Sequence, residues 1–291
     1  MRRPLAVSIL ALLLTACSPE PPLVDGPARP ALWIIEDADT RIVLLGSVHQ
    51  LPSDLDWQSG ALSRAMTAAD QLILELAPAE LGKAPALFAA TSSNEPVPSL
   101  DRRFGQQTAE RVRDYARDAG IDEDDAERME SWALALVIGR VIVADVGLSA
   151  DNGVETRVTT AFASRPTSGF ETAAEQLAMF DTLPAAAQDS MVASAIADAP
   201  EARTRTRRLL NAWARGDTAA LAAAAEEAMA DTPALIEPVI LARNRAWAEA
   251  LAARMQQPGS IFVAVGAGHL VGNGSLIEEL QSKGFTARRL Q

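Results

Sequence analysis

The sequence predicts an α/β fold in which one mixed central sheet is built from both ends of the chain and carries a large helical insertion in the middle. Short β-rich runs lie near both ends, while residues 102–255 are dominated by Ala-rich and charge-interleaved helical patterns. No Pro/Gly/Ser-rich linker divides this middle part. With 48% hydrophobic and 22% charged residues, the chain can bury a large core. We therefore expect a single α/β domain over residues 31–291.

The individual elements follow from periodicity and from turn signals. The runs that favour strands are short and apolar, and they cover residues 32–35, 41–45, 72–76, 165–170, 261–265 and 285–290. The polar residues 36–40 between the first two runs predict a hairpin. Apolar residues at helical spacing predict helices at 56–69, 236–255 and 275–283, the last one ended by Gly284. The apolar stretch 132–146 contains Arg140 and Asp145, so we interpret it as a buried helix rather than a membrane span.

The first sixteen residues have the pattern of a secretory signal peptide. Arg2 and Arg3 precede an apolar run over 5–14 that is too short to span a bilayer, and Leu-Thr-Ala-Cys at 14–17 looks like a bacterial lipobox. We expect cleavage before Cys17 and acylation of its thiol, the alternative being an ordinary signal with an incidental cysteine. Residues 17–30 are rich in proline and predict an extended tether. The protein would then be exported and held by its lipid, facing the periplasm or on the outer membrane.

Composition and motifs also exclude several classes of partner. The 26 basic and 38 acidic residues leave a net charge of -12, which argues against binding the phosphate backbone of a nucleic acid. The glycine-rich loop at 266–272 has Val271 where a dinucleotide fingerprint needs glycine, and no P-loop is present, so we expect no nucleotide. A single cysteine excludes an intramolecular disulfide.

Both histidines of the chain are the last residue of a Gly-x-x-His motif that follows an apolar strand. The motifs run from Gly46 to His49 and from Gly266 to His269. With 17 glycines in 291 residues, composition alone would place glycine three positions before both histidines with a probability of roughly 0.3%. Each motif is followed by a loop, a helix and a strand, so the chain contains two similar β-loop-α-β units as an imperfect internal repeat.

The two histidines are therefore the first candidates for a functional site. Ligands of open α/β sheets bind beyond the carboxyl ends of the strands, where both imidazoles would emerge. Two imidazoles that converge there indicate metal ligation or acid-base work. The alternative is that each histidine ends a strand and satisfies local backbone groups.

Two glutamates are further candidates. Glu75 lies within the apolar run 72–76, where its carboxylate needs a cation, a metal or hydrogen bonds; it is either the partner of an arginine or a ligand or general base. Glu171 follows the short strand at 165–170. Thr172 and Glu175 form a predicted capping box that explains Glu175 but not Glu171, so Glu171 could join the site.

Arg243 and Asn244 lie on the apolar face of the helix predicted over 236–255. Polar groups on the face of a helix that packs on the core need partners. Arg243 could pair with Glu75 or Glu171, or it could hold an anionic substrate or an oxyanion, and we favour the ion pair slightly.

Taken in order, these motifs resemble those of the TraB/GumN family, also called TraB/PrgY/GumN. The resemblance covers the chain from about Leu32 to its end and rests on the two Gly-x-x-His loops, Glu75 in Leu-Glu-Leu, the stretch 171–176, Arg243-Asn244 and the closing Gly-Ala-Gly-His-Leu. One departure is Ser47, where the family usually has Thr and the hydroxyl is kept. The family is similar to the Tiki proteins, which are membrane-anchored metal-dependent proteases with two Gly-x-x-His motifs and an essential glutamate. The resemblance implies that His49, His269 and Glu75 are metal ligands or catalytic groups.

The leading expectation is a lipid-anchored, extracytoplasmic, metal-dependent hydrolase that acts on a peptide or related amide. His49, His269 and an acidic residue would hold a divalent ion, Mn, Co or Zn, that acidifies a bound water. Glu75 or Glu171 would accept the proton of that water, and Arg243 or Asn244 would steady the oxyanion. One alternative is a non-catalytic lipoprotein that captures a peptide signal, haem or another ligand at the same cleft. Another is a metal-free esterase with histidine as general base.

Overall fold

The computed structural model describes residues 27–58, 60–144, 146 and 148–291. Its strands are β1 (Leu32–Glu36), β2 (Thr40–Ser47), β3 (Gln71–Leu76), β4 (Thr167–Glu171), β5 (Gly259–Gly266) and β6 (Arg288–Arg289). Its α-helices are α1 (Gly60–Ala68), α2 (Pro78–Leu81), α3 (Ala84–Thr91), α4 (Leu100–Phe104), α5 (Gln106–Asp118), α6 (Glu123–Arg128), α7 (Ser131–Ala144), α8 (Val154–Ala161), α9 (Ala173–Asp181), α10 (Ala185–Asp198), α11 (Ala202–Ala214), α12 (Thr218–Met229), α13 (Ala242–Arg254) and α14 (Leu276–Ser282). Shorter helices are the 3-10 helices η1 (Ala150–Asn152), η2 (Ala199–Glu201), η3 (Pro233–Leu235) and η5 (Ala267–Leu270) and the π-helix η4 (Ile236–Leu241).

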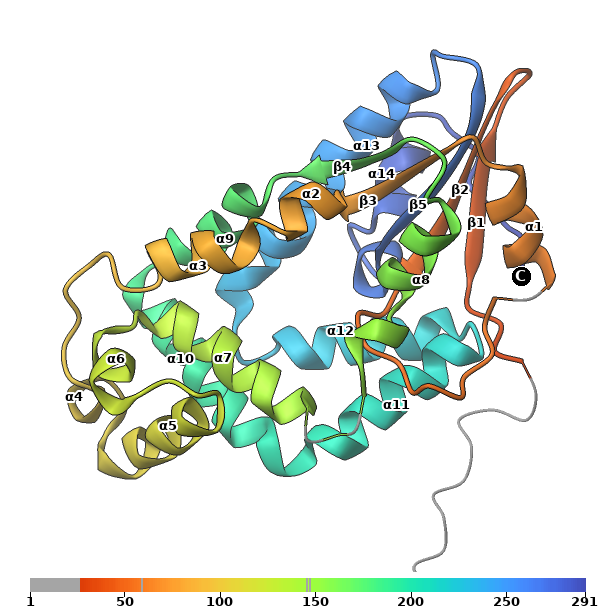
Figure 1. The fold of residues 1–291 in the computed structure, drawn as a ribbon. Helices are drawn as coiled ribbons and strands as arrows, with labels where there is room; N and C mark the ends of the chain where they lie inside the picture. The colour runs from red at the N-terminus through yellow and green to blue at the C-terminus, as the bar shows by residue number, and fades with distance from the viewer. Residues whose placement is uncertain (1–26, 59, 145, 147) are drawn as a thin grey trace, which may run out of the picture.

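One six-stranded mixed sheet is the frame of the protein, as the sequence predicts. Its strand order is β4-β3-β5-β2-β1-β6. The four strands β4, β3, β5 and β2 are parallel, while β1 pairs antiparallel with both β2 and β6. The central strands come from both ends of the chain, and the helices α4 to α7, α9 and α10 form a lobe beside the sheet (Figure 1). The helices α11 and α12 pack against the sheet through Trp213 and Leu221. The prediction of a sheet with a helical insertion is confirmed.

The two repeat units are both present as parallel β-α-β units. In the first unit, α1 connects β2 to β3 across β5; in the second, α14 connects β5 to β6 across β2 and β1. The two crossovers run in opposite directions along the sheet. Because such crossovers are right-handed, their helices lie on opposite faces. In Figure 1, α1 lies at the right of the strands and α14 lies behind them.

Three elements differ by several residues from their predicted extents, and the helix expected over 56–69 covers only Gly60–Ala68. The strand expected over 285–290 pairs only at Arg288–Arg289, because Gly284 ends α14 with a φ of +91° and residues 285–287 turn back to the sheet. The helix expected over 236–255 is divided into η4 and α13. Pro238 in η4 has no N–H, which an early position in a helix tolerates.

The buried side chains form two clusters. The larger cluster covers the sheet and includes Leu44, Phe262 and Trp213, while the second lies within the helical lobe around Trp132 and Leu134 of α7. The apolar stretch 132–146 is therefore helical as predicted as far as Ala144, and it is buried as far as Ile138, while Arg140 and Ala144 are exposed. Across the described ranges, no helix combines the length and the apolar character that a membrane crossing needs.

The N-terminal signal and Cys17 lie outside the described residues. The end of the predicted tether is already part of the fold, because Ala28 and Pro30 are buried. The N–H of Ala28 donates to Asp56 O at 2.6 Å, and the N–H of Arg29 donates to Ala214 O at 2.6 Å. The chain thus meets the domain beside the end of α11.

Candidate functional site

The carboxyl ends of the four parallel strands bring the predicted site residues to one edge of the sheet. Along the order β4-β3-β5-β2, Glu171 and Glu75 lie at the ends of the first two strands, and His269 and His49 follow the last two. β2 and β5 are direct neighbours, with Ser47 opposite Gly266. The two Gly-x-x-His motifs therefore leave the sheet side by side, as the sequence predicts.

The first glycine of each motif stands where another element approaches closely. A Cβ at Gly46 would lie 2.9 Å from Ala267 Cα, and a Cβ at Gly266 would lie 3.1 Å from Glu75 Oε1. Gly266 also donates its N–H to Glu75 Oε1 at 2.6 Å. The repeated glycines are needed for these approaches, because even alanine would bring its methyl group into the neighbouring element.

Arg243 lies at the centre of the buried part of the site, and all five of its N–H groups are used. Nε and Nη2 donate to the two oxygens of Glu171 at 2.8 and 2.9 Å, and Nη2 also donates to Glu75 Oε2 at 2.6 Å. Nη1 donates to Val239 O at 3.1 Å and to His269 Nε2 at 3.0 Å. The side chain of Arg243 is 9% exposed. The ion pair that the sequence favours for Arg243 is present, with both glutamates at once.

The hydrogen bonds of His269 determine its tautomer. Arg243 is only a donor, so Nε2 of His269 must accept and its proton must be on Nδ1. Nδ1 then donates to Asn244 Oδ1 at 2.7 Å, and Asn244 Nδ2 donates to Gly274 O at 2.8 Å. His269 is therefore a neutral acceptor toward the arginine, and Asn244 orients it.

Burial and charge act on the ionisation of these groups. Burial lowers the pKa of His269 to about 4, and the positive charge of Arg243 acts in the same direction. Burial alone would raise the pKa of Glu75, but the charge of Arg243 and the N–H of Gly266 outweigh it and hold this pKa below its ordinary value. At neutral pH the cluster thus contains a neutral histidine and an ionised Glu75.

His49 has a different partner, Glu155 of α8. Nδ1 of His49 donates to Glu155 Oε1 at 2.8 Å, and the Ser47 hydroxyl donates to the same oxygen at 2.6 Å. The side chain of His49 is 73% exposed, while that of Glu155 is 25% exposed. The hydrogen bond with Glu155 raises the pKa of His49 to about 9, against the opposing effect of desolvation. The charge of Glu75 also acts on His49, so the two groups of residues share one electrostatic site.

Glu155 is the residue that the sequence analysis missed. It lies in the first turn of α8, where the helix N-terminus favours a negative charge. Gly153, just before this helix, contacts the backbone carbonyl of His49, and the N–H of Val154 donates to Val48 O at 3.0 Å. A glycine followed by a helix start is the only sequence signal, and it does not indicate which loop will dock there.

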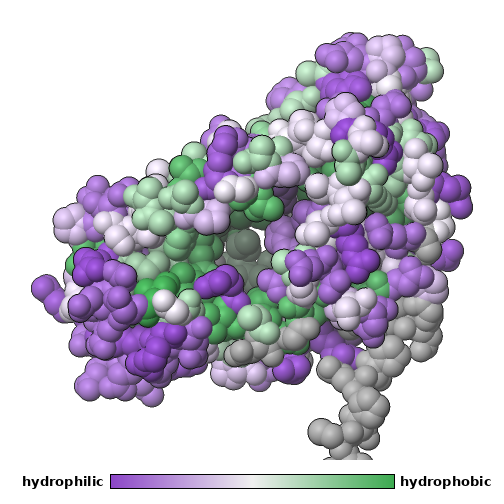
Figure 2. Space-filling model, viewed as in Figure 1, coloured by the Kyte–Doolittle hydropathy of each residue, from purple (hydrophilic) through white to green (hydrophobic). Residues whose placement is uncertain are grey.

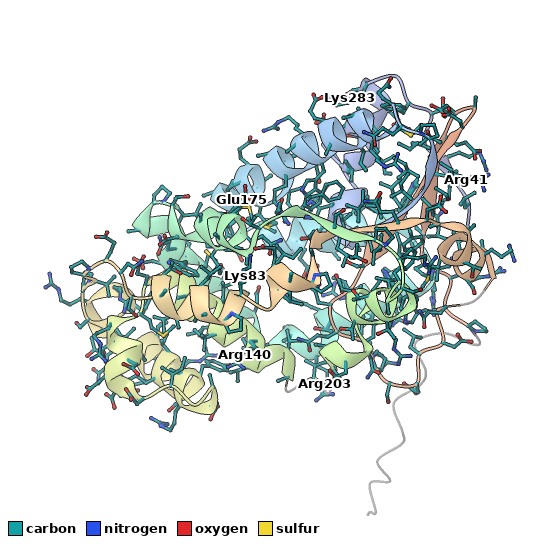
Figure 3. All side chains as sticks on the ribbon, turned by 45° about the horizontal axis from the view of Figure 1, so that its top comes forward. Arg41, Lys83, Arg140, Glu175, Arg203 and Lys283 are labelled. Carbon is teal, nitrogen blue, oxygen red and sulfur yellow. The ribbon has the colours of Figure 1, made fainter. Side chains whose placement is uncertain are left out.

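The capping box predicted at the start of α9 is present and is separate from the site. Glu175 accepts from the N–H of Thr172 at 2.7 Å, and the Thr172 hydroxyl accepts from the N–H of Glu175. Figure 3 labels Glu175 on α9. The next residue, Gln176, contacts the site. It donates to Glu171 Oε2 at 3.1 Å and, more weakly, to Glu75 Oε2 at 3.4 Å.

The predicted metal ligands do not fit a metal ion in this arrangement. The lone pair of His269 Nε2 and oxygens of Glu75 and Glu171 accept hydrogen bonds from Arg243, whereas a metal needs these same lone pairs. His49 faces Glu155 instead of His269. Within the described ranges, no group of three His, Cys, Asp or Glu side chains has an arrangement that could hold a metal ion.

A hollow with apolar walls lies between the sheet and the helical lobe. Figure 2 shows it as a depression with green, hydrophobic side chains at its walls.

Comparison with known proteins gives a family match over nearly the whole domain. The TraB/PrgY/gumN family matches residues 31–289. The chain is similar to the protein of Escherichia coli K12 named "Uncharacterized protein YbaP", with 26% identity over 261 residues that cover 87% of this chain and 92% of the relative. The Shigella flexneri protein of the same name has the same identity and coverage. No solved structure matches. With its two Gly-x-x-His loops on neighbouring strands and a match from residue 31 to 289, the chain belongs to the TraB/PrgY/gumN family.

Proposed function

We propose that this protein is a hydrolase of a peptide, amide or ester bond in which His49 is the general base and no metal ion is required. The observation that carries the proposal is the pairing of His49 Nδ1 with Glu155 Oε1 at 2.8 Å, beside the second donor Ser47. This pairing leaves Nε2 as the free nitrogen of an imidazole whose side chain is 73% exposed. A histidine held through one nitrogen by a carboxylate, with the other nitrogen open, is suited to proton transfer.

The proposed reaction needs only water, the substrate and these side chains. In the neutral imidazole the proton remains on Nδ1, facing Glu155, and Nε2 accepts a proton from a water molecule. The oxygen of that water forms a bond to the carbonyl carbon of the substrate. When the bond from this carbon to the amine or alcohol breaks, Nε2 returns the proton to the leaving group. Glu155 stays ionised throughout and keeps the ring oriented.

The Arg243 cluster supports the edge of the sheet rather than the proton transfer. Its N–H groups are all engaged, and Glu75 and Glu171 accept several hydrogen bonds each, so these groups are not free to act on a substrate. They link the ends of β3, β4 and β5 to α13 and hold the site rigid.

Hydrolysis of p-nitrophenyl butyrate and of a fluorescently labelled casein by the full chain, with and without EDTA, tests this function. We expect turnover that survives the chelator, falls by about 10²–10⁴-fold in His49→Gln and falls markedly in Glu155→Gln. Below the pKa of His49 near 9, the rate should rise about tenfold per pH unit, because only the neutral ring accepts a proton.

The control variant is Arg41→Ala. Arg41 lies at the start of β2, at the opposite end of the strand from Ser47, and pairs with Glu36 on the surface (Figure 3). Its removal should leave the rate unchanged. Activity that EDTA abolishes and Mn, Co or Zn restores would contradict the metal-free mechanism and support the metal-dependent one. Stoichiometric ligand binding without turnover would instead support a binding protein.

We further propose that the protein works outside the cytoplasm as a lipoprotein. The support is the sequence alone, in which a basic start and an apolar run precede Leu-Thr-Ala-Cys at 14–17. The acyl groups on Cys17 would hold the domain at the membrane surface, since a net charge of -12 gives no attraction to anionic lipids.

A further inference from the structure

We infer that the guanidinium of Arg243 is a permanent internal cation that occupies the position of a metal ion among Glu75, Glu171 and His269. The inference does not depend on the proposed hydrolysis. It explains why the ligand set that the sequence predicts is present in part and yet does not form a metal site.

The contacts of the guanidinium match those of a coordinated cation. Glu171 binds it through both oxygens at 2.8 and 2.9 Å, Glu75 through one oxygen at 2.6 Å, and His269 through the lone pair of Nε2 at 3.0 Å. Carboxylate oxygens and imidazole nitrogens are common ligands of metal ions in proteins. Here each of them aims a lone pair at a nitrogen of Arg243.

Charge prevents a divalent ion from binding beside the arginine. The two carboxylates carry two negative charges, and Arg243 already neutralises one of them within a site that is 9–15% exposed. A guanidinium does not deprotonate in a protein. A divalent ion would therefore lie next to a fixed positive charge and would have to displace Arg243 to reach the lone pairs.

Further contacts anchor Arg243 in this place. The guanidinium carbon lies 4.5 Å from the ring centre of Trp247, and Trp247 Nε1 donates to Glu171 Oε1 at 2.9 Å. Nη1 also donates to Val239 O of η4, which directly precedes α13. Displacing Arg243 would break its five hydrogen bonds and its stacking on Trp247 together, so the arrangement resists the exchange of arginine for metal.

The inference predicts that removing the guanidinium creates a metal site. In Arg243→Ala, two carboxylates and the Nε2 lone pair would surround an open space while Gly266 and Asn244 still orient Glu75 and His269. The double variant Arg243→Ala with His269→Ala would lack the nitrogen ligand. Arg243→Lys would keep a positive charge at the centre.

The experiment is a Co²⁺ titration of the full chain, followed by visible absorption and by metal content after dialysis. We expect no Co²⁺ retained by the wild type or by Arg243→Lys, about one ion per chain in Arg243→Ala, and loss of that ion in the double variant. The matched control is Arg113→Ala, which removes an arginine from among Asp101, Glu123 and Glu127, without a histidine nearby in that ion-pair group. It should not give the absorption of nitrogen-ligated Co²⁺.

Two results would overturn the inference. One is a wild type that retains one Co²⁺ per chain and loses it in His269→Ala, because Arg243 would then move aside for the metal. The other is a folded Arg243→Ala, verified by circular dichroism, that retains none. If Arg243→Ala does not fold, the wild-type titration decides: an absence of Co²⁺ absorption supports the inference, and His269-dependent absorption contradicts it.

Discussion

The two histidines have the same local motif and opposite chemistry. His269 is 5% exposed and accepts a hydrogen bond from an arginine, whereas His49 is largely exposed and donates to a carboxylate. Desolvation and a neighbouring cation disfavour the imidazolium form of His269, while a neighbouring anion favours it in His49. The difference arises from burial and from partners that are far away in the sequence.

Because the chain has only two histidines, their titration can be followed one by one. We expect the pKa of His49 near 9 and that of His269 near 4, measured by the pH dependence of the imidazole NMR signals. At pH 7 His49 is then protonated and His269 neutral. His49 therefore stabilises the fold below its unfolded pKa near 6.5, an effect lost as the pH rises through 9. His269 acts in the acid range instead. As the pH falls from 6.5 to 4, the unfolded chain takes up a proton that the folded protein does not bind, so the free energy of unfolding decreases.

Two variants assign the cause of each shift. Glu155→Gln removes the charge that faces His49, so the pKa of His49 should fall toward 6.5 while that of His269 stays low. His49→Gln leaves a single signal, which must be the one with the low pKa. Two histidines that both titrate near 6.5 in the wild type would show that neither environment exists in solution.

At the scale of elements, the site is assembled where loops and helices meet the ends of parallel strands. β2 and β5 deliver the two motifs, but α8 supplies Glu155 and α13 supplies Arg243 and Asn244. The contact of α8 with the loop after β2 depends on Gly153, whose missing side chain leaves room for the carbonyl of His49.

Gly153→Ala should therefore push α8 away from this loop. The added methyl group would overlap His49 O, and we expect a loss of about 1–3 kcal/mol in the free energy of unfolding in urea. The pKa of His49 should fall at the same time, because the distance to Glu155 increases.

Gly139→Ala is the matched control for this substitution. Gly139 lies within α7, and a Cβ there would meet nothing within 4 Å. In a helix, alanine is favoured over glycine by up to about 1 kcal/mol, so this variant should be as stable as the wild type or more stable. Equal stability of the two variants would contradict the close approach at Gly153.

At the scale of the whole molecule, the domain begins beside the end of α11, where Ala28 and Arg29 bond to it. Residues 17–27 precede this point and would connect it to a lipid on Cys17. At about 3.3 Å per residue, an extended segment of this length reaches about 35 Å. The tether would thus let the site work at a distance from the membrane surface that carries the anchor.

Anchoring is tested by expressing the full chain in a bacterium and separating membranes from soluble protein. We expect the wild type in the membrane fraction, with a mature N-terminus at Cys17 and the added mass of its acyl groups. Cys17→Ser should lose the acyl mass and remain an unprocessed precursor, while Ser18→Ala should behave as the wild type. A mature chain that starts elsewhere, or that carries no lipid, would contradict the proposal.

The sequence predicted most of the fold and of the buried cluster. The β1–β2 hairpin, β3, β5 and α14 follow from local periodicity, and the shared Gly-x-x-His pattern predicted that both motifs leave the sheet at one edge. The favoured partners of Arg243 were also predicted, because a buried arginine and buried glutamates have few other ways to be satisfied. The short extent of β6 was not predicted, because its pairing with β1 depends on how far residues 285–287 turn back to the sheet.

By itself, the sequence determined the fold class, the family and the identity of the residues at the sheet edge, because periodicity and spacing are local properties of the chain. Only the tertiary structure decided which of these residues face each other. Glu155 is 106 residues from His49, and Arg243 is 168 residues from Glu75. The protonation of each histidine depends on these long-range partners and on burial, neither of which the two identical motifs encode. The same four-residue pattern thus yields a neutral, buried acceptor at His269 and an exposed, charged side chain at His49.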